Sequence, residues 1–129
     1  MAIRITGPVD ADFLVYQEGV KLDNWHLDAF NNSCCTVDIT LRVYKITYDP
    51  SAEYGITEIG HQCKTIKPGW HQFLTVSMGG EEHTMAVIEH PLDRDDIFVT
   101  VSIRDTNDRN VIGTIFRHED LIDIEYIRC

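Results

Sequence analysis

The amino-acid sequence predicts an all-β chain that folds as a single antiparallel Greek-key β-sandwich of about eight strands. Three segments, residues 37–44, 73–78 and 97–104, alternate apolar and polar side chains at every second position. That period is typical of a strand with one buried face. We find no convincing long amphipathic helix. Many short strands separated by turns are typical of sandwiches and barrels.

The three alternating segments anchor the prediction because each keeps its rhythm over several residue pairs. Their apolar positions are Val37, Ile39, Leu41 and Val43 in the first, Leu74, Val76 and Met78 in the second, and Ile97, Val99, Val101 and Ile103 in the third. The intervening positions are mostly polar. We therefore expect each segment to place one row of side chains in the core.

Six further strands are expected from shorter runs of β-forming residues. They cover residues 13–17, 20–29, 60–66, 83–89, 111–116 and 122–127. The spacing of Leu22, Trp25, Ala29 and Phe30 also fits a helical turn. We favour a strand there, with Trp25 and Leu27 on one face. Turn-forming residues separate most strands, at 18–19, 31–33, 67–69, 79–80, 91 and 107–110, and residues 49–55 are expected to form a loop.

Length and composition indicate one globular domain over residues 1–129. Hydrophobic residues make up 43% of the chain and charged residues 25%, as in ordinary folded proteins. The 21 acidic and 11 basic residues give a net charge of −10, spread along the chain. Such a charge disfavours direct binding to nucleic acid or to anionic lipid, unless cations bridge the contact.

The chain carries no signal-peptide pattern at Met1 to Arg4 and no apolar run long enough for a membrane helix, so we expect synthesis and retention in a cytoplasm. Its four cysteines fit neither a dense disulfide framework nor a CxxC pair. In that compartment we expect free, buried thiols. The adjacent pair Cys34 and Cys35 is not expected to form a disulfide, because the peptide between them strains the bond geometry.

Two histidine patterns raise a metal-site hypothesis. His61 and Cys63 would project from the same strand face and His71 follows a turn, so a zinc site is conceivable; the alternative is a set of separate surface histidines. Residues 66–73 resemble the second conserved motif of cupins, in which a Pro-Gly turn leads to a metal-ligating histidine, here His71. The resemblance implies a small metal-dependent enzyme, although no HxH pair precedes Gly60.

Residues 97–121, IFVTVSIRDTNDRNVIGTIFRHEDL, resemble the late portion of C2 domains, where an alternating strand ends in an Asp-rich loop. In that family, loop aspartates at one end of a sandwich hold calcium, which bridges to anionic phospholipid. The resemblance implies a C2-like or jelly-roll strand order and calcium ligation by Asp105 and Asp108. Asn107 and Asn110 stand where C2 domains usually have further aspartates.

A second acidic cluster, residues 93–96, precedes the strand that begins at Ile97. We interpret it as a solvated turn whose carboxylates accept hydrogen bonds from backbone amides. Because this cluster and residues 105–108 flank one strand, they are expected at its opposite ends. They cannot then share one calcium site.

Aromatic residues at those positions of an alternating strand that otherwise carry polar side chains, which we call the polar phase, are candidates for a protein-contact surface. Tyr44 and Phe98 occupy such positions, and Tyr48 and Tyr54 lie beside the expected loop. We therefore predict that Tyr44, Tyr48, Tyr54 and Phe98 contribute to contact with a partner.

Catalytic signatures are missing from the sequence: it has no Gly-x-Ser-x-Gly elbow and no phosphate-binding glycine loop. We therefore expect a non-enzymatic protein-binding or assembly module without a required cofactor, calcium being the one candidate ligand. The partner would be another protein or a second copy of the chain. A structural subunit of a larger viral, phage or secretion-machine particle is one such role.

Overall fold

The computed structural model describes residues 1–10, 22–48, 54–81, 83–111 and 113–125. Within these ranges the regular structure is strand, apart from two 3-10 turns, η1 (Arg94–Asp96) and η2 (His118–Asp120). The all-β prediction is confirmed. The described part of the chain contains no helix with the length and apolar character needed to cross a bilayer.

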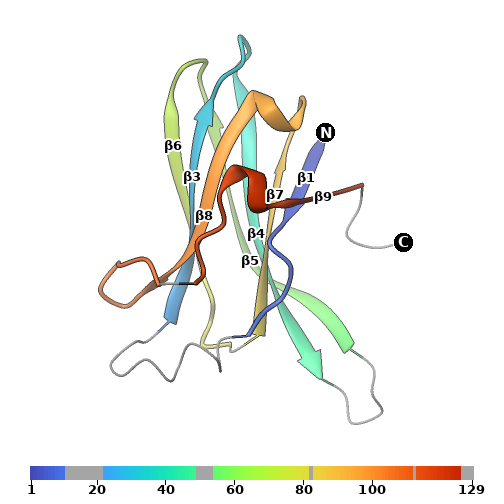
Figure 1. The fold of residues 1–129 in the computed structure, drawn as a ribbon, viewed down its shortest axis with the longest axis vertical. Coiled ribbons are helices and arrows are strands. Elements are labelled where there is room, and N and C mark those ends of the chain that lie inside the picture. The colour runs from blue at the N-terminus through green and yellow to red at the C-terminus, as the bar shows by residue number, and fades with distance from the viewer. Residues whose placement is uncertain (11–21, 49–53, 82, 112, 126–129) are drawn as a thin grey trace.

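The strands form two antiparallel sheets that pack face to face (Figure 1). In the six-stranded sheet the order is β5 (Tyr54–Ile66), β4 (Val37–Tyr48), β7 (His83–His90), β1 (Ala2–Ile5) and β9 (Ile122–Ile124), with β2 (Val9–Asp10) paired to β7. In the three-stranded sheet the order is β6 (His71–Ser77), β3 (Leu22–Asn31) and β8 (Ile97–Asp105). This arrangement is the predicted β-sandwich; a Greek-key order, jelly-roll or C2-like, stays a prediction.

The core fills the space between the sheets, and alternation decides which residues enter it. On β3 the inward side chains are Trp25, Leu27 and Ala29, each no more than 1% exposed. They meet the inward rows of β4 and β8, which are the apolar rows predicted from the sequence. Trp25 also donates a hydrogen bond from Nε1 to Thr84 Oγ1 of β7, at 3.0 Å. This bond links the two sheets through the core.

Chain connections close both sides of the sandwich. On one side, β5 of the six-stranded sheet runs through a turn into β6 of the three-stranded sheet. On the other, the C-terminal segment bridges Phe116 to Val101 of β8 and then pairs β9 with β1. Figure 1 shows this segment, in red, passing from β8 across to β1. Residues distant in sequence therefore share one surface.

Most predicted strands are present with shifted ends. Residues 22–31 form a strand, so the helical alternative is wrong, and β5 begins at Tyr54, inside the expected loop. Residues 111–116 are not a regular strand: Gly113 has φ +89° and Thr114 donates to the Val111 carbonyl, which makes a turn. The predicted strand at 13–17 and residues 126–127 of the last one lie outside the described residues.

Asn31 holds two connections together at one end of the sandwich, the β3–β4 turn and the β5–β6 turn. Its buried side chain donates from Nδ2 to the carbonyls of Cys35 and Ile66, at 2.7 and 2.9 Å. Its Oδ1 accepts from the backbone amide and the hydroxyl of Ser33. Its backbone accepts from Gly69, whose φ of +74° suits glycine in this turn.

The cysteine prediction is half correct. Cys34, Cys35 and Cys63 carry free thiols, as expected, but all three are exposed instead of buried. Cys34 and Cys35 occupy the turn that Asn31 braces, and Cys63 points outward from β5. Cys129 lies outside the described residues.

We expect Asn31→Ala to lower the free energy of unfolding by about 2–4 kcal/mol, because it leaves the buried Ile66 carbonyl without its donor and releases the Ser33 turn. Urea denaturation measures this loss. Asn32→Ala is the matched control, since Asn32 is exposed, and it should change stability by about 0.5 kcal/mol or less. Equal losses for the two variants would contradict the role given to Asn31.

Candidate functional site

The outer side of the three-stranded sheet carries large apolar side chains that the sandwich leaves in solvent. Phe30 of β3, Phe73 of β6 and Phe98 of β8 are 38%, 52% and 44% exposed. Each lies on the strand phase opposite to the core residues, where polar side chains are usual. We call this surface the aromatic face.

Register brings these rings together. Phe30 is directly opposite Phe98 on one side and His71 on the other. In the next outward row, Asp28 is opposite Phe73. Side chains in facing or diagonal positions of neighbouring strands are within contact reach. On the aromatic face Phe30 and Phe98 therefore lie side by side, and Phe73 lies in the next row, separated from Phe30 by the pair of His71 and Asp28.

Asp28 lies at the centre of the aromatic face between two histidines. Its Oδ1 is 3.3 Å from His26 Nε2 and 3.2 Å from His71 Nε2. A carboxylate only accepts, so both nitrogens carry the proton. His26 Nδ1 lies within hydrogen-bonding distance of the Thr75 hydroxyl, at 3.3 Å, and its ring stacks on Phe73. These contacts hold a 44%-exposed carboxylate in a fixed position.

Side chains of β5 cover the free edge of β6. Lys64 Nζ donates to the Phe73 carbonyl at 2.6 Å and lies 4.3 Å from the Phe73 ring centroid. Gln62 Oε1 accepts from the Thr75 amide at 2.9 Å. An open strand edge would invite pairing with another chain. Here two of its backbone groups are occupied, which leaves the face of the sheet as the open surface.

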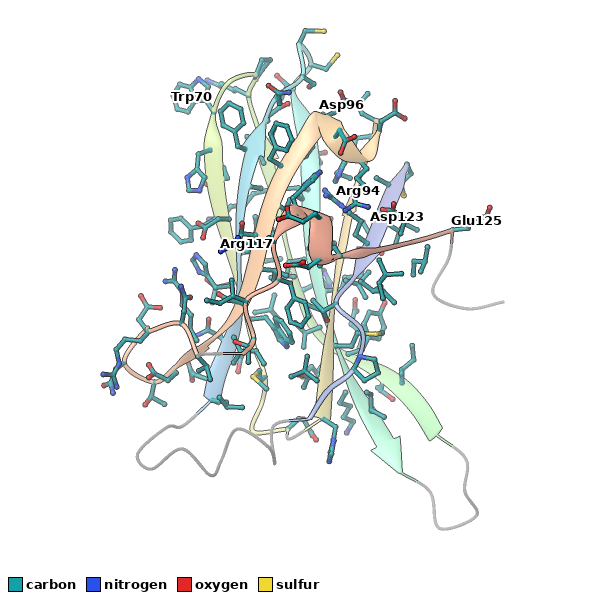
Figure 2. All side chains as sticks on the ribbon, viewed as in Figure 1. Trp70, Arg94, Asp96, Arg117, Asp123 and Glu125 are labelled. Atoms are coloured by element: carbon teal, nitrogen blue, oxygen red, sulfur yellow. The ribbon has the colours of Figure 1, made fainter. Side chains whose placement is uncertain are left out.

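Two adjoining hollows open on the aromatic face and share Asp28. The larger, about 450 Å³, has Phe30, Phe98 and Ile115 as its apolar lining. Its polar lining comes from Asp28, His71, Thr100, Arg117, His118 and Glu119. The smaller, about 320 Å³, is lined by His26, Asp28, Phe73, Thr75, Arg104 and Asp108. Figure 2 shows Trp70, which is 60% exposed, at the end of β6, and Arg117 beside β8.

A buried arginine fixes one wall of the larger hollow. Arg4 of β1, fully buried between the sheets, donates to His118 Nδ1 at 2.9 Å, to His90 Nε2 at 2.8 Å and to the Ile97 carbonyl at 3.1 Å. His118 in turn donates from Nε2 to Asp95 at 2.9 Å and meets Phe98 edge-on. Arg4 thereby positions His118, which contacts the exposed Phe98.

The chemistry of this network requires neutral imidazoles. Arginine offers only donors, so His90 Nε2 and His118 Nδ1 must accept. Burial, opposed by the hydrogen bond from Nδ1 to the Pro91 carbonyl, lowers the pKa of His90 below its ordinary value. Burial also lowers the pKa of Arg4 to about 10. The hydrogen bond from His118 lowers the pKa of Asp95.

The four predicted contact residues do not gather at one place. Phe98 is 44% exposed on the aromatic face. Tyr44 is only 8% exposed, on the opposite outer surface, where it packs with Met85 and Val87 in an apolar cluster of that sheet. Contact of these residues with a partner stays a prediction. Tyr48 and Tyr54 pair through their backbones, and their side chains lie outside the described residues.

Asp105 and Asp108, the predicted calcium ligands, lie at the last residue of β8 and in the turn after it, and both are paired with arginine. Asp105 Oδ1 accepts from the backbone amides of Asn107 and Arg109, and these bonds lower its pKa. Its Oδ2 accepts from Arg109 Nε at 3.3 Å. Asp108 accepts from Arg104 at 3.1 Å. The carboxylates thus brace the turn, and calcium binding stays a prediction.

Residues 93–96 and 105–108 flank β8 at its opposite ends, as predicted, and Asp96 Oδ2 accepts from the Asp93 amide as expected of a turn. His61 pairs with Glu58, and His71 with Asp28. Among the described residues, no group of three or more His, Cys, Asp or Glu is arranged to hold a metal ion.

Sequence reasoning missed Phe30, Phe73, Ile115, His26 and Asp28, and it named His71 as a metal ligand and not as a partner of Asp28. Phe73 could have been found, because it occupies the polar phase of its strand just as Phe98 does. Phe30 and Ile115 could be identified as site residues only from the strand pairing and from the path of the C-terminal segment. Comparisons with protein-family models, curated protein sequences and solved structures give no match for this chain.

We expect stability to fall on mild acidification because the folded pKa of His90 lies below its unfolded value. Above about pH 6.5 the imidazole is neutral in both states. Below it the unfolded chain binds the proton first, and unfolding becomes easier until the lower folded pKa is passed. One such group changes the free energy of unfolding by up to about 1.4 kcal/mol per pH unit.

The measurement is urea denaturation of the wild type and of His90→Gln between about pH 7.5 and about pH 5. Glutamine keeps an oxygen that accepts from Arg4 but does not titrate, so its pH slope should be shallower. Asn32→Ala, which changes an exposed side chain that does not titrate, is the control and should keep the wild-type slope. Identical slopes for His90→Gln and the wild type would refute the assignment.

Proposed function

We propose that this chain is a non-enzymatic binding or assembly module that contacts another protein through the aromatic face. The observation that carries the proposal is the exposure of Phe30, Phe73 and Phe98 on three neighbouring strands. Large apolar side chains gathered on one exposed face of a folded domain are typical of a contact surface. Aromatic side chains are also enriched at the centres of protein interfaces.

Two further features support a protein partner. Two backbone groups at the β6 edge, the Phe73 carbonyl and the Thr75 amide, are taken by Lys64 and Gln62, which favours contact through side chains on the face. The face also mixes apolar rings with polar groups held in fixed positions, such as Asp28, and such preorganisation lowers the entropy cost of binding. A subunit of a larger particle, assembled after synthesis in a cytoplasm, is a role in which this face would stay covered.

The test compares the wild type with the double variant Phe73→Ser/Phe98→Ser. Truncation of two central aromatics should weaken partner binding by about 2 kcal/mol or more, or about thirtyfold. The purified proteins are crosslinked in an extract of the source cells, and the captured proteins are identified by mass spectrometry. Sedimentation velocity across a concentration series reports association of the chain with itself.

The matched control is Ile122→Ser, which removes a 55%-exposed apolar side chain from the six-stranded sheet. It should capture the same companions as the wild type. Circular dichroism melting checks that all variants fold. Unchanged companions and unchanged sedimentation in the double variant would refute the proposal.

A further inference from the structure

Resting on the proposed function, we propose that the larger hollow accepts a basic segment of the partner protein, with one apolar side chain as its anchor. The lining supplies both halves of this recognition. Phe30, Phe98 and Ile115, all between 38% and 45% exposed, form the apolar part. The carboxylates of Asp28 and Glu119, in the same lining, form the acidic part.

The charges around the hollow favour a cation. Asp28 and Glu119 line it, whereas the charge of Asp95 on the lining residue His118 is offset by Arg4 and Arg94, which donate to the same histidine. Arg117 is the one arginine or lysine in the lining as far as the chain is described. The net charge of −10 adds a long-range field of the same sign. Complementary fields of this kind raise association rates and select partners by charge.

Asp28 is suited to bind the cation because its position is already set. Both imidazole contacts are made by Oδ1, with His26 from the same strand and His71 from β6. The carboxylate is nonetheless 44% exposed beside the ring of Phe30. A partner's guanidinium or ammonium group would therefore meet an ordered acceptor next to an apolar surface, which reduces the entropy lost on binding.

The same charges disfavour the other occupants. An acidic peptide or a nucleic acid would bring anions against Asp28 and Glu119. A second copy of the chain would bring these two carboxylates against their own counterparts, with one Arg117 from each copy to offset them. A basic segment of a different protein that carries an apolar side chain is the occupant that complements both the apolar and the acidic lining residues.

The probe is a blocked pentapeptide, Gly-Arg-Phe-Arg-Gly, titrated into isotope-labelled protein while backbone amide signals are followed by NMR. We expect the amides of Phe30, Phe98 and Thr100 to shift, with affinity about tenfold higher than for Gly-Glu-Phe-Glu-Gly. Raising the salt from about 20 to about 200 mM should weaken binding, since the contact depends on exposed charges.

Two double variants, each of which removes two carboxylates, are compared at equal net charge. Asp28→Asn/Glu119→Gln removes two carboxylates from the hollow and should weaken binding of the arginine peptide about fivefold to tenfold. Asp38→Asn/Glu81→Gln removes two from elsewhere and should leave the affinity within about twofold. Equal weakening by both pairs would mean that only net charge matters, and it would overturn the proposal.

Other outcomes also decide the matter. Equal or tighter binding of the glutamate peptide would overturn the basic-segment assignment. Amide shifts that follow protein concentration alone would point to a second copy instead. If neither peptide moves these signals, while Phe73→Ser/Phe98→Ser still loses its captured partner, this inference fails and the proposed function stands.

Discussion

Side-chain alternation on β3, the central strand of the three-stranded sheet, sets the arrangement of the whole molecule. Trp25, Leu27 and Ala29 must face the other sheet, because they are the apolar row and their burial drives the packing of the two layers. The alternating residues of β3, among them Asp28 and Phe30, then point away from the core. A slip of one residue would place Asp28 in the core, at the cost of burying a carboxylate. The core register and the outer face are therefore fixed by one constraint.

The closure of the sandwich determines which part of its surface stays open. The β5–β6 turn brings Gln62 and Lys64 against the β6 edge, and the C-terminal segment lies along part of the β8 edge through Phe116. Both devices protect strand edges from pairing with another chain. The flat outer side of β6, β3 and β8 is what these connections leave open, so the candidate site is a face.

Arg4 connects the interior to that face. Burying a guanidinium costs desolvation free energy, which is why the pKa of Arg4 falls to about 10. Part of the cost is offset by His90, His118 and the Ile97 carbonyl, all of which accept its hydrogen bonds. The network ties β1, β7 and the C-terminal segment together. It also makes the position of one hollow wall depend on the hydrogen bond from Arg4 to His118.

The sequence by itself determined the fold class, the core rows of β4 and β8, and the outward position of Phe98, because a period of two needs only neighbouring residues to be read. Other features required the tertiary structure. The pairing of Asp28 with His71 joins residues 43 positions apart, and Tyr44 is buried although its phase is polar. Such contacts depend on which strands become neighbours, and strand pairing between distant segments leaves no periodic mark in either of them.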